Sequence, residues 1–451
     1  MNQIQDALFA DLYELTMAAC YFENRMFAPA TFSLYIRKYG PHRSYFISAG
    51  IDEVLDYLER FHFTADDLDY LQSTGLFSRD FLNYLENLRF TGELFAIPEG
   101  RLFFKDEPIL EITAPIIEAQ LIESFLINAV NLQVSIATKA ARCVHAAGGR
   151  NLVDFSLRRT QGTDAGMKVA RASFLAGFKA TSNVLAGKQY SIPISGTMAH
   201  SFVLSFAEEI EAFRAFARTF PDRTVLLIDT YDTVSGAKKA AEVGREMRER
   251  GQTLKGVRLD SGDIAKLSRE VRRILDEADL KEVVIFASGG FDEFGIEEAL
   301  SRGGAIDAFG VGTKMGVSAD APYNDIAYKL VEYNGRPVLK LSTAKKTLVN
   351  QKQVFRETRE GKMIGDTIGM RAEILPGKPL LECVMREGKR LAAPEPLARI
   401  RERFLAEFLT LPDSHKSIKN AENYPVRLSP MLEKAQSKTV REVKKRELGE
   451  S

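Results

Sequence analysis

The sequence contains few cysteines, and they are scattered. Only Cys20, Cys143 and Cys383 occur among its 451 residues, and no two of them form a CxxC pair. This spacing indicates neither a zinc ribbon nor a disulfide framework. The chain also lacks an excess of charge of either sign, because 61 basic residues balance 61 acidic ones. A neutral chain argues against a nucleic-acid surface and a polybasic membrane patch, so an anionic ligand must be bound by local charge.

Long hydrophobic runs are also missing. No apolar run approaches the roughly 20 residues that a membrane-spanning helix needs. The opening MNQIQDALFADLYELTM carries Asp6 and Asp11 where a signal peptide would have basic and then apolar residues. Hydrophobic residues make up 45% of the chain, which is ordinary for a globular protein. We therefore expect a soluble cytoplasmic protein that binds neither membrane nor nucleic acid.

The hydrophobic pattern divides the chain into parts. Residues 1–127 mix a helical segment, DALFADLYELTMAACYFEN, with strand-like ones such as ATFSLYIRKY, which predicts an N-terminal α/β domain. Residues 128–327 have a different hydrophobic pattern, which predicts a separate catalytic domain. Residues 328–400 return to strand-like pieces, and we expect them to complete the N-terminal domain. Residues 401–451 form a charge-rich tail of helical composition.

In residues 128–327, short apolar runs alternate with helical stretches. The predicted strands are NLVDFS, YSIPIS, TVLLIDT, GVRLDS, EVVIFAS and DAFGVG. The predicted helices include SFAEEIEAFRAFARTF, TVSGAKKAAEVGREMRER, DIAKLSREVRRILDEA and FDEFGIEEALSRG. Alternation of this kind indicates parallel strands. An open doubly wound sheet would also fit, but no GxGxxG opens the first unit, so we favour a closed or nearly closed βα barrel within an α/β fold.

Polar residues and glycines collect where the predicted barrel strands end. Catalytic groups of a βα barrel lie on the loops at the carboxyl ends of its strands. These loops offer Asp154, Phe155, Arg158, Arg159, Ser195, Thr197, His200, Asp229, Tyr231, Asp232, Arg258, Asp260, Ser261, Asp263, Ser288, Gly289, Gly290, Gly310, Gly312 and Thr313. Such a set suits an anionic, phosphate-bearing substrate with hydroxyl groups.

Two glycine turns, ASGGFDE and FGVGTKMG, could bind phosphate. Backbone N–H groups at a turn that leads into a helix bind phosphate oxygens, although glycines also serve simply to make tight turns. Their place on the last two predicted strands favours phosphate, because barrels often build that site from their last loops. In RLDSGD, Arg258 can form paired hydrogen bonds to a carboxylate or phosphate, and Asp260 can accept from two vicinal hydroxyls. The alternative for this pair is an ion pair that closes a strand end.

His200, one of only five histidines, stands in ISGTMAHSF. A capping box at Ser205–Glu208 predicts that the next helix begins near Ser205, which leaves His200 in the preceding loop. We expect the carboxylate of Asp229 to hold one ring nitrogen, so that the other can act as a base or nucleophile. The alternative is a core histidine without a chemical role.

Taken together, the loop motifs resemble those of the nicotinate phosphoribosyltransferase family, a type II phosphoribosyltransferase family. The motifs are DFSLRRTQG, GTMAHSF, LLIDTYDT, RLDSGD, FASGGFDE and FGVGT, with DLYELTM before them and KLST and KQVFR after them. The resemblance implies an irregular βα barrel beside a mixed α/β N-terminal domain, in a head-to-tail homodimer with the active site at the interface. It implies that nicotinate and 5-phosphoribosyl 1-pyrophosphate give nicotinate mononucleotide and pyrophosphate. ATP hydrolysis would be coupled through a phosphohistidine, with Mg²⁺.

The resemblance also implies roles for single residues. His200 would take the γ-phosphoryl group of ATP, and Asp229 would orient it. Phe155 would lie against one face of the pyridine ring, with Tyr13 of the partner subunit against the other. The further predicted binding residues are Arg258 and Asp260 for the carboxylate and the ribose hydroxyls, Gly289, Gly290, Gly312 and Thr313 for the 5-phosphate, Arg158 and Lys139 for pyrophosphate or ATP phosphates, and Thr197.

Ser182 in FKATSNVLAG is the residue from which we predict a choice between nicotinate and nicotinamide. The sister family that uses nicotinamide has an aspartate at this point, which can accept from an amide and would repel a carboxylate. A serine can donate to a carboxylate, so it favours nicotinate. Quinolinate phosphoribosyltransferase uses no ATP and would not need His200. A non-catalytic phosphosugar-binding barrel is a further alternative, but the joint presence of His200, Asp229 and Asp260 argues against it.

Overall fold

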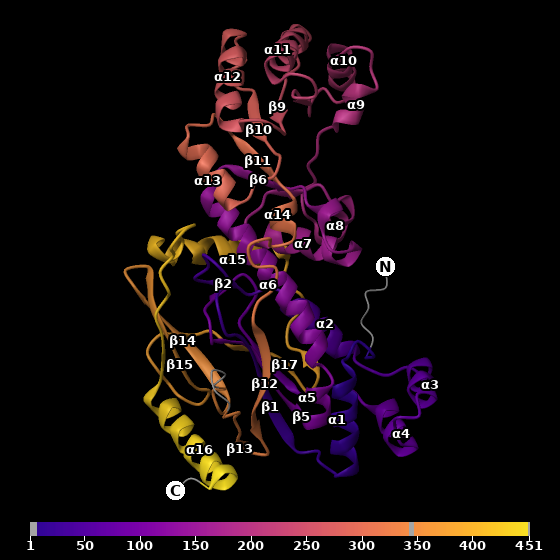
Figure 1. The fold of residues 1–451 in the computed structure, drawn as a ribbon, viewed down its shortest axis with the longest axis vertical. Helices are drawn as coiled ribbons and strands as arrows, with labels where there is room; N and C mark the ends of the chain where they lie inside the picture. Colours follow the sequence, from indigo (N-terminus) through magenta and orange to yellow (C-terminus); the bar gives the residue numbers. More distant parts are fainter. Residues whose placement is uncertain (1–6, 342–346, 450–451) are drawn as a thin grey trace. The chain divides into compact units, whose positions relative to one another are not determined.

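The structure is a computed structural model that describes residues 7–341 and 347–449 (Figure 1). The chain folds into two compact units, one within Met1–Ser135 and Tyr323–Ser451 and the other Ile136–Pro322. The last two residues of the predicted motif KLST, Ser342 and Thr343, fall within 342–346, outside the described residues.

The first unit is built on a seven-stranded antiparallel sheet. Its strand order is β13 (Arg336–Pro337), β12 (Ile326–Tyr333), β1 (Pro29–Ile36), β5 (Pro108–Pro115), β3 (Glu93–Ala96), β17 (Glu382–Arg386) and β18 (Lys389–Arg390). The strands β12 and β17, which follow the second unit in sequence, pair with β1 and β3. The N-terminal strands therefore share one sheet with strands that lie some 200 to 300 residues later.

Two smaller sheets and several helices complete this unit. One sheet has the order β16 (Lys378–Pro379), β14 (Lys352–Arg359), β15 (Lys362–Met370) and β19 (Val426–Leu428), and the other pairs β2 (Phe46–Ile47) with β4 (Leu102–Phe103). The helices are α1 (Leu12–Glu23), α2 (Ile51–Arg60), α3 (Ala65–Ser73), α4 (Arg79–Asn87), α5 (Ile116–Gln120), α15 (Leu397–Thr410) and α16 (Pro430–Leu448), and α6 (Glu123–Ala146) has residues in both units. The predicted helix DALFADLYELTMAACYFEN begins only at Leu12, so its Leu8 precedes the helix.

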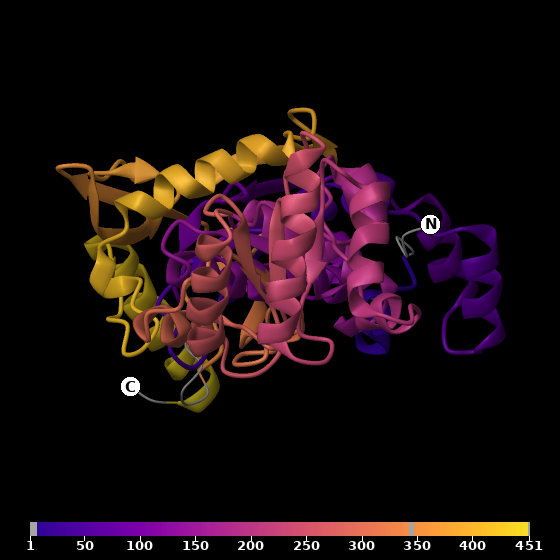
Figure 2. The ribbon, with the colours of Figure 1, turned by 90° about the horizontal axis from the view of Figure 1, so that it is seen from above.

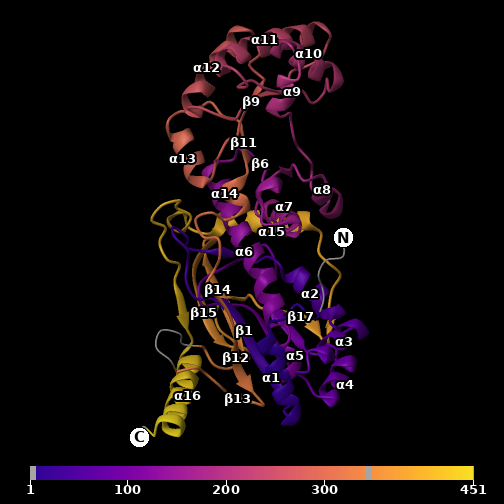
Figure 3. The same ribbon diagram turned by 45° about the vertical axis from the view of Figure 1, so that its right-hand side comes forward.

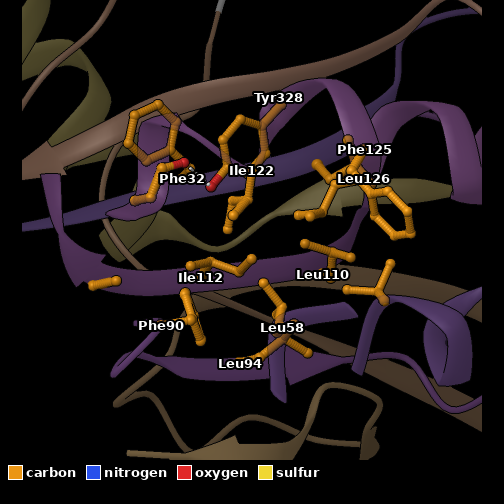
Figure 4. Close-up of a cluster of buried hydrophobic side chains, with 14 of the residues drawn as sticks. Phe32, Leu58, Phe90, Leu94, Leu110, Ile112, Ile122, Phe125, Leu126 and Tyr328 are labelled. Atoms are coloured by element: carbon orange, nitrogen blue, oxygen red, sulfur yellow. Dashed lines mark hydrogen bonds between the residues drawn. The ribbon is translucent and has the colours of Figure 1, made fainter. Parts of the chain in front are cut away.

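A core of aromatic and aliphatic side chains holds the first unit together (Figure 4). The ring of Phe32 on β1 stacks on that of Tyr328 on β12 with centroids 4.6 Å apart. Tyr328 also donates its hydroxyl to the carbonyl of Ala119, so its one polar atom is satisfied inside the core. This stacking packs the N-terminal strand against the strand that follows the second unit.

The C-terminal tail is anchored at its last helix. Leu432 of α16 is fully buried, and Gln436 accepts from the backbone of Val349 at 3.0 Å and donates to the carbonyl of Thr347 at 3.1 Å. The charged residues of α16 lie mostly on the exposed side, as its composition suggested. One face of this helix therefore packs on the first unit while the other is solvated.

One helical stretch is apolar enough to cross a membrane. Among the described residues, Ile116–Ala146 passes the test of length and composition, with a mean hydropathy of 1.3 in its most apolar window. However, 72% of that window is buried inside the protein. Core helices of globular proteins pass the same test, and the burial of this stretch gives it that explanation.

Glu14 on α1 is a fully buried carboxylate that accepts from the backbone N–H of Ser124 at 3.1 Å and from its hydroxyl at 2.5 Å. Its second oxygen has no hydrogen-bond partner. Burial, assisted by the nearby charge of Glu123, raises the pKa of Glu14 from 4.5 to about 7. The folded state therefore binds this proton more tightly than the unfolded state does, and folding stability falls as the pH rises from about 4.5 through about 7.

We expect Glu14→Gln to stabilise the protein at pH 8 and to change little at pH 5, because glutamine keeps a hydrogen-bond acceptor without the buried charge. The gain at pH 8 should reach up to about 3 kcal/mol, since one pKa unit corresponds to about 1.4 kcal/mol. Urea unfolding at both pH values measures it. The exposed Glu86→Gln on α4 is the control and should show no such pH dependence. Equal effects of Glu14→Gln at the two pH values would contradict the assignment.

The second unit contains a six-stranded parallel sheet. Its order is β7 (Ala180–Thr181), β6 (Asn151–Asp154), β11 (Ala308–Val311), β10 (Val284–Ala287), β9 (Gly256–Leu259) and β8 (Val225–Leu227). The helices are α7 (Thr163–Leu175), α8 (Val184–Tyr190), α9 (His200–Leu204), α10 (Glu209–Thr219), α11 (Thr233–Glu249), α12 (Ile264–Glu277), α13 (Glu293–Ser301) and α14 (Thr313–Gly316). Helices α10 to α13 form an arc outside the strands (Figure 3), and Figure 2 shows neighbouring helices of this arc packed beside one another.

The sheet is a curled, parallel half-barrel. The expectation was a closed or nearly closed, irregular βα barrel: the parallel, curled arrangement agrees with it, and full closure is not seen among the described residues. Strands β7 and β8 are its two ends, and no pairing joins them within the described residues. The predicted strand YSIPIS does not form, because Tyr190 ends α8, Ser191 is the turn after it, and most of the remaining residues are irregular. Only Ile194 forms an isolated parallel bridge with Thr181, since neighbouring Pro193 has no N–H to donate. The short strand β7 was not predicted.

Candidate active site

Arg258 is the centre of a hydrogen-bonded cluster at the carboxyl end of β9. Its Nε donates to the hydroxyl of Ser288 at 2.8 Å, and its Nη2 donates to Oδ1 of Asp260 at 2.7 Å. Its Nη1 donates to the hydroxyl of Thr197 at 3.1 Å and to the carbonyl of Met198 at 3.2 Å. Three nitrogens are thus fixed by groups from three different loops, so the guanidinium plane has one orientation.

Phe155 provides an aromatic surface beside this guanidinium. The guanidinium carbon of Arg258 lies 5.2 Å from the centroid of the Phe155 ring, which is a cation–π distance. The ring fits there because Gly310 on β11 has no side chain: a Cβ at Gly310 would come within 2.6 Å of the Phe155 ring. In FGVG, the first glycine is therefore needed to make room for the ring of Phe155, in addition to any role of this motif as a turn.

Two aspartates at the ends of neighbouring strands are linked to each other. Asp229, after β8, accepts from the backbone N–H of Asp260 at 2.9 Å and from the hydroxyl of Ser261 at 2.6 Å, both through Oδ2. Its Oδ1 is buried and has no hydrogen-bond partner. Asp260 accepts from Ser288 at 2.5 Å in addition to Arg258. The carboxylates of Asp229 and Asp260 are therefore held in one hydrogen-bonded network, in which Oδ1 of Asp229 is an acceptor without a partner.

The electrostatic surroundings keep Asp260 ionised. Partial burial works to raise its pKa, but the hydrogen bonds from Ser288 and Arg258 work in the other direction, as do the charges of Arg258 and His200. Together these contacts lower the pKa of Asp260 below its ordinary value.

His200 differs from its prediction in two respects. It is the first residue of the short helix α9, and the longer helix α10 starts at Glu209 rather than near Ser205, because Glu208 is still extended. Its Nδ1 lies 3.1 Å from the hydroxyl of Thr230 instead of meeting Asp229, whose hydrogen-bonded oxygen is occupied by Asp260 and Ser261. The ring is half-buried at the edge of the cluster.

The two glycine turns end β10 and β11. Gly289 has a φ of +96°, and a Cβ there would lie 1.8 Å from the carbonyl oxygen of Asp260, so no other residue fits. Gly290 is exposed with open space around its Cα. The turns are tied together by an ion pair between Asp292 and Lys314, whose charged atoms are 3.4 Å apart. Gly312 immediately precedes Thr313, the exposed first residue of α14.

Other predicted residues have less defined places. Ser182 follows β7 directly and is half-buried, with its backbone N–H bonded to the carbonyl of Asp154 at 2.9 Å. Arg158 is exposed on the short 3-10 helix Leu157–Arg159. Tyr13 belongs to the first unit, where its side chain is 45% exposed.

Lys139 corrects its prediction as a phosphate-binding residue. Its side chain is fully buried, and its ammonium lies 2.6 Å from a carboxylate oxygen of Glu293 and 2.8 Å from one of Asp320. Although burial works to lower it, these negative charges raise the pKa of Lys139 above its ordinary value. Arg142 shares Glu293 at 2.8 Å. Lys139 is therefore part of a buried ionic cluster between α6 and α13, not a group that faces a ligand.

Sequence reasoning missed Thr230 and gave Ser288 no role. Ser288 directly follows β10 in IFAS, Thr230 comes three residues after the end of β8 in LLIDT, and each contacts one of the central polar side chains. Their position at a strand end was the only available signal. No group of three or more His, Cys, Asp or Glu side chains with metal-ligand spacing was found among residues 7–341 and 347–449.

Family comparisons match three successive parts of the chain. Models described as the nicotinate phosphoribosyltransferase N-terminal domain, family and C-terminal domain match residues 8–131, 150–362 and 376–436. A nicotinate phosphoribosyltransferase of Mycobacterium tuberculosis is 48% identical over 434 residues, which cover 96% of this chain and 93% of that protein. The chain belongs to the nicotinate phosphoribosyltransferase family. This confirms the resemblance seen in the loop motifs.

Other members of the nicotinate phosphoribosyltransferase family agree with this assignment. A nicotinate phosphoribosyltransferase of Bacillus subtilis is 40% identical over 358 residues, covering 78% of this chain and 73% of its own. The crystal structure of human nicotinic acid phosphoribosyltransferase superposes with a TM-score of 0.85 at 27% identity, over 95% of this chain and 99% of the human one. The open, curled sheet is therefore part of a fold known in the family.

Proposed function

We propose that this chain joins nicotinate to 5-phosphoribosyl 1-pyrophosphate, giving nicotinate mononucleotide and pyrophosphate for NAD biosynthesis, and that ATP hydrolysis drives the reaction through phosphorylated His200. The observation that carries the proposal is the fixed guanidinium of Arg258 beside the ring of Phe155. Nicotinate is a flat aromatic ring with one carboxylate. An aromatic face next to an oriented guanidinium offers stacking and charge-assisted hydrogen bonds to such a molecule.

The neighbouring loops suit the phosphoribosyl group. The ionised carboxylate of Asp260 can accept from ribose hydroxyls, and its low pKa keeps it an acceptor at neutral pH. Gly290, Gly312 and Thr313 lie exposed or half-buried at two adjacent strand ends, where backbone N–H groups and a hydroxyl can bind the 5-phosphate. The family's fold and the motif order support this assignment of roles.

Mg²⁺ is part of the proposal, and the residues present fit it. The buried, unpartnered Oδ1 of Asp229 and the carboxylate of Asp260 stand on one frame, and carboxylate oxygens are the ligands that this hard cation prefers. Mg²⁺ usually keeps several waters and binds through one or two carboxylates together with substrate phosphates. These two aspartates would therefore hold the ion, which supplies charge neutralisation for the pyrophosphate group. A cluster of three protein ligands is not required for this kind of site.

Coupling to ATP is tested by stoichiometry. With nicotinate, 5-phosphoribosyl 1-pyrophosphate, ATP and Mg²⁺, the protein should form ADP together with pyrophosphate and nicotinate mononucleotide, and removal of Mg²⁺ by a chelator should stop both. Omission of nicotinate should leave no nucleotide product. Nucleotide formation from nicotinate with no ADP above background would refute the coupling and leave the transferase activity standing.

The proposal includes a homodimer with a shared site. Tyr13 is exposed on the first helix and lines a cavity of about 490 Å³ with Asp11 and Glu123. The exposed part of this ring is available to cover a ring bound in another subunit. We propose that Tyr13 of the partner subunit closes the nicotinate site opposite Phe155.

We expect Tyr13→Ala and His200→Ala chains, each inactive in the ATP-stimulated transfer, to regenerate that ATP-stimulated activity when they are mixed and allowed to exchange subunits. A mixed dimer would contain one site with both residues intact, so up to about half of the dimers, each with one working site, should be active in the statistical limit. Activity is measured before and after exchange, with the unmixed variants as controls. A monomer by light scattering, or no recovery despite proven exchange, would refute the shared site.

A further inference from the structure

The imidazole of His200 meets a hydroxyl rather than a carboxylate. Oδ2 of Asp229 and Oδ1 of Asp260 each accept hydrogen bonds from other groups. Nδ1 of His200 lies 3.1 Å from Oγ1 of Thr230, and both side chains are half-buried. Oδ2 of Asp229, the residue before Thr230, accepts from Asp260 and Ser261. Those two hydrogen bonds hold the loop after β8, so the hydroxyl of Thr230 is presented to the ring by a fixed backbone.

We propose that Thr230 is a positioning residue that selects the reactive tautomer of His200. In the neutral ring only one nitrogen carries a proton, and only the other has a lone pair for attack. If Nδ1–H donates to Oγ1 of Thr230, the lone pair is placed on Nε2. The inference deepens the proposed function, on which it rests, because it assigns Nε2 as the atom that accepts the phosphoryl group.

A hydroxyl performs this task differently from a carboxylate. A carboxylate on Nδ1 would stabilise the protonated imidazolium, which has no lone pair and cannot attack. A threonine hydroxyl is neutral, so it orients Nδ1–H without adding negative charge beside it. The neighbouring charges are those of Asp260, whose Oδ1 accepts from Arg258 and Ser288, and of Asp229, tied by its two donors. Thr230 is thus the partner that fixes the ring.

The phosphoryl step balances with this assignment. The lone pair of Nε2 forms a bond to the γ-phosphorus of ATP, and the bond from that phosphorus to the β,γ-bridging oxygen breaks. The electron pair of the broken bond leaves with ADP. The proton on Nδ1 stays in place and remains donated to Thr230, so the phosphorylated ring carries the positive charge that balances the reaction.

The test compares Thr230→Val, which removes the hydroxyl at nearly constant shape, with Thr230→Ser, which keeps it. The first-order rate of His200 labelling from γ-labelled ATP should fall about tenfold in Thr230→Val, the effect of losing one hydrogen bond worth roughly 1.4 kcal/mol. It should recover to within about twofold in Thr230→Ser, as a kept hydrogen bond implies. Thr219→Val is the matched control, because that hydroxyl bonds only to the carbonyl of Ala215 in its own exposed helix.

A second measurement is independent of ATP. Nitrogen NMR of protein labelled in histidine distinguishes the two neutral tautomers, and His200→Ala identifies the signal of His200. The parent and Thr230→Ser should show the proton on Nδ1, and Thr230→Val should show a mixture. A proton on Nε2 in the parent, or an unchanged tautomer and labelling rate in Thr230→Val, would overturn the inference. The predicted tautomers in a protein that takes no label would leave Thr230 as the group that sets the tautomer of His200, and would refute the proposed phosphorylation together with the assignment of Nε2 as its acceptor.

Discussion

Replacement of His200 by alanine is expected to abolish the transfer of label from γ-labelled ATP to the protein. In the parent, the label should survive base and be lost in acid, because a phosphorus–nitrogen bond to histidine is acid-labile. The physical basis is the place of His200: half-buried, at the start of a short helix, with one ring nitrogen bonded to Thr230, the residue after Asp229. ATP should then no longer stimulate nucleotide formation, while transfer without ATP should persist.

The other histidines provide the control for this result. His62 is exposed and its Nδ1 lies 2.6 Å from the carbonyl of Arg60, and Nδ1 of His415 lies 2.8 Å from the carbonyl of Glu422. Both belong to the first unit. His62→Ala should therefore label as the parent does. Equal labelling of His200→Ala and the parent would show that the phosphoryl group, if any, is carried elsewhere.

The strand ends of the second unit were predictable because their chemistry is local. Five of the six predicted strands occur. Arg258 lies near the carboxyl end of β9, and Asp229 and Asp260 follow β8 and β9, as the pattern required. Parallel strands that alternate with helices place all their carboxyl ends at one edge, so the order along the chain is enough to bring these residues together. The contacts of Arg258 with Asp260 and Ser288 are a consequence of that rule.

The partner of each side chain could not be predicted, because it depends on atomic distances. Asp229 and Thr230 are neighbours in sequence, and a shift of one residue decides whether a carboxylate or a hydroxyl meets His200. Lys139 carries the positive charge that suits a phosphate, yet its buried ammonium forms ion pairs with Glu293 and Asp320, which lie over 150 residues away in the sequence. Closure of a barrel likewise depends on pairing between strands at opposite ends of the sheet, which no local pattern encodes.

The chain is expected to prefer nicotinate over nicotinamide roughly a hundredfold or more in kcat/KM. The two bases differ in one group: a carboxylate has only acceptors, whereas an amide carries two donors. Arg258 presents donors at the aromatic face of Phe155, which follows β6. Ser182, with its hydroxyl, follows β7, the strand that pairs with β6. An amide would leave its own donors unpaired, at a cost of about 1–3 kcal/mol, and charge-assisted bonds to the carboxylate widen the gap.

Ser182→Asp should narrow or reverse that preference, chiefly because a second negative charge repels the carboxylate while an aspartate can accept from an amide. The measurement is kcat/KM for both bases in the parent and the variant. Ser301→Asp, which adds the same charge on the exposed end of α13 in the same unit, is the matched control and should keep the parent ratio. Equal use of both bases by the parent would refute the preference itself. If the parent prefers nicotinate and Ser182→Asp keeps the parent ratio, the discrimination does not lie at Ser182. The guanidinium of Arg258, held by Thr197, Met198, Asp260 and Ser288, would then be the remaining group able to select for a carboxylate.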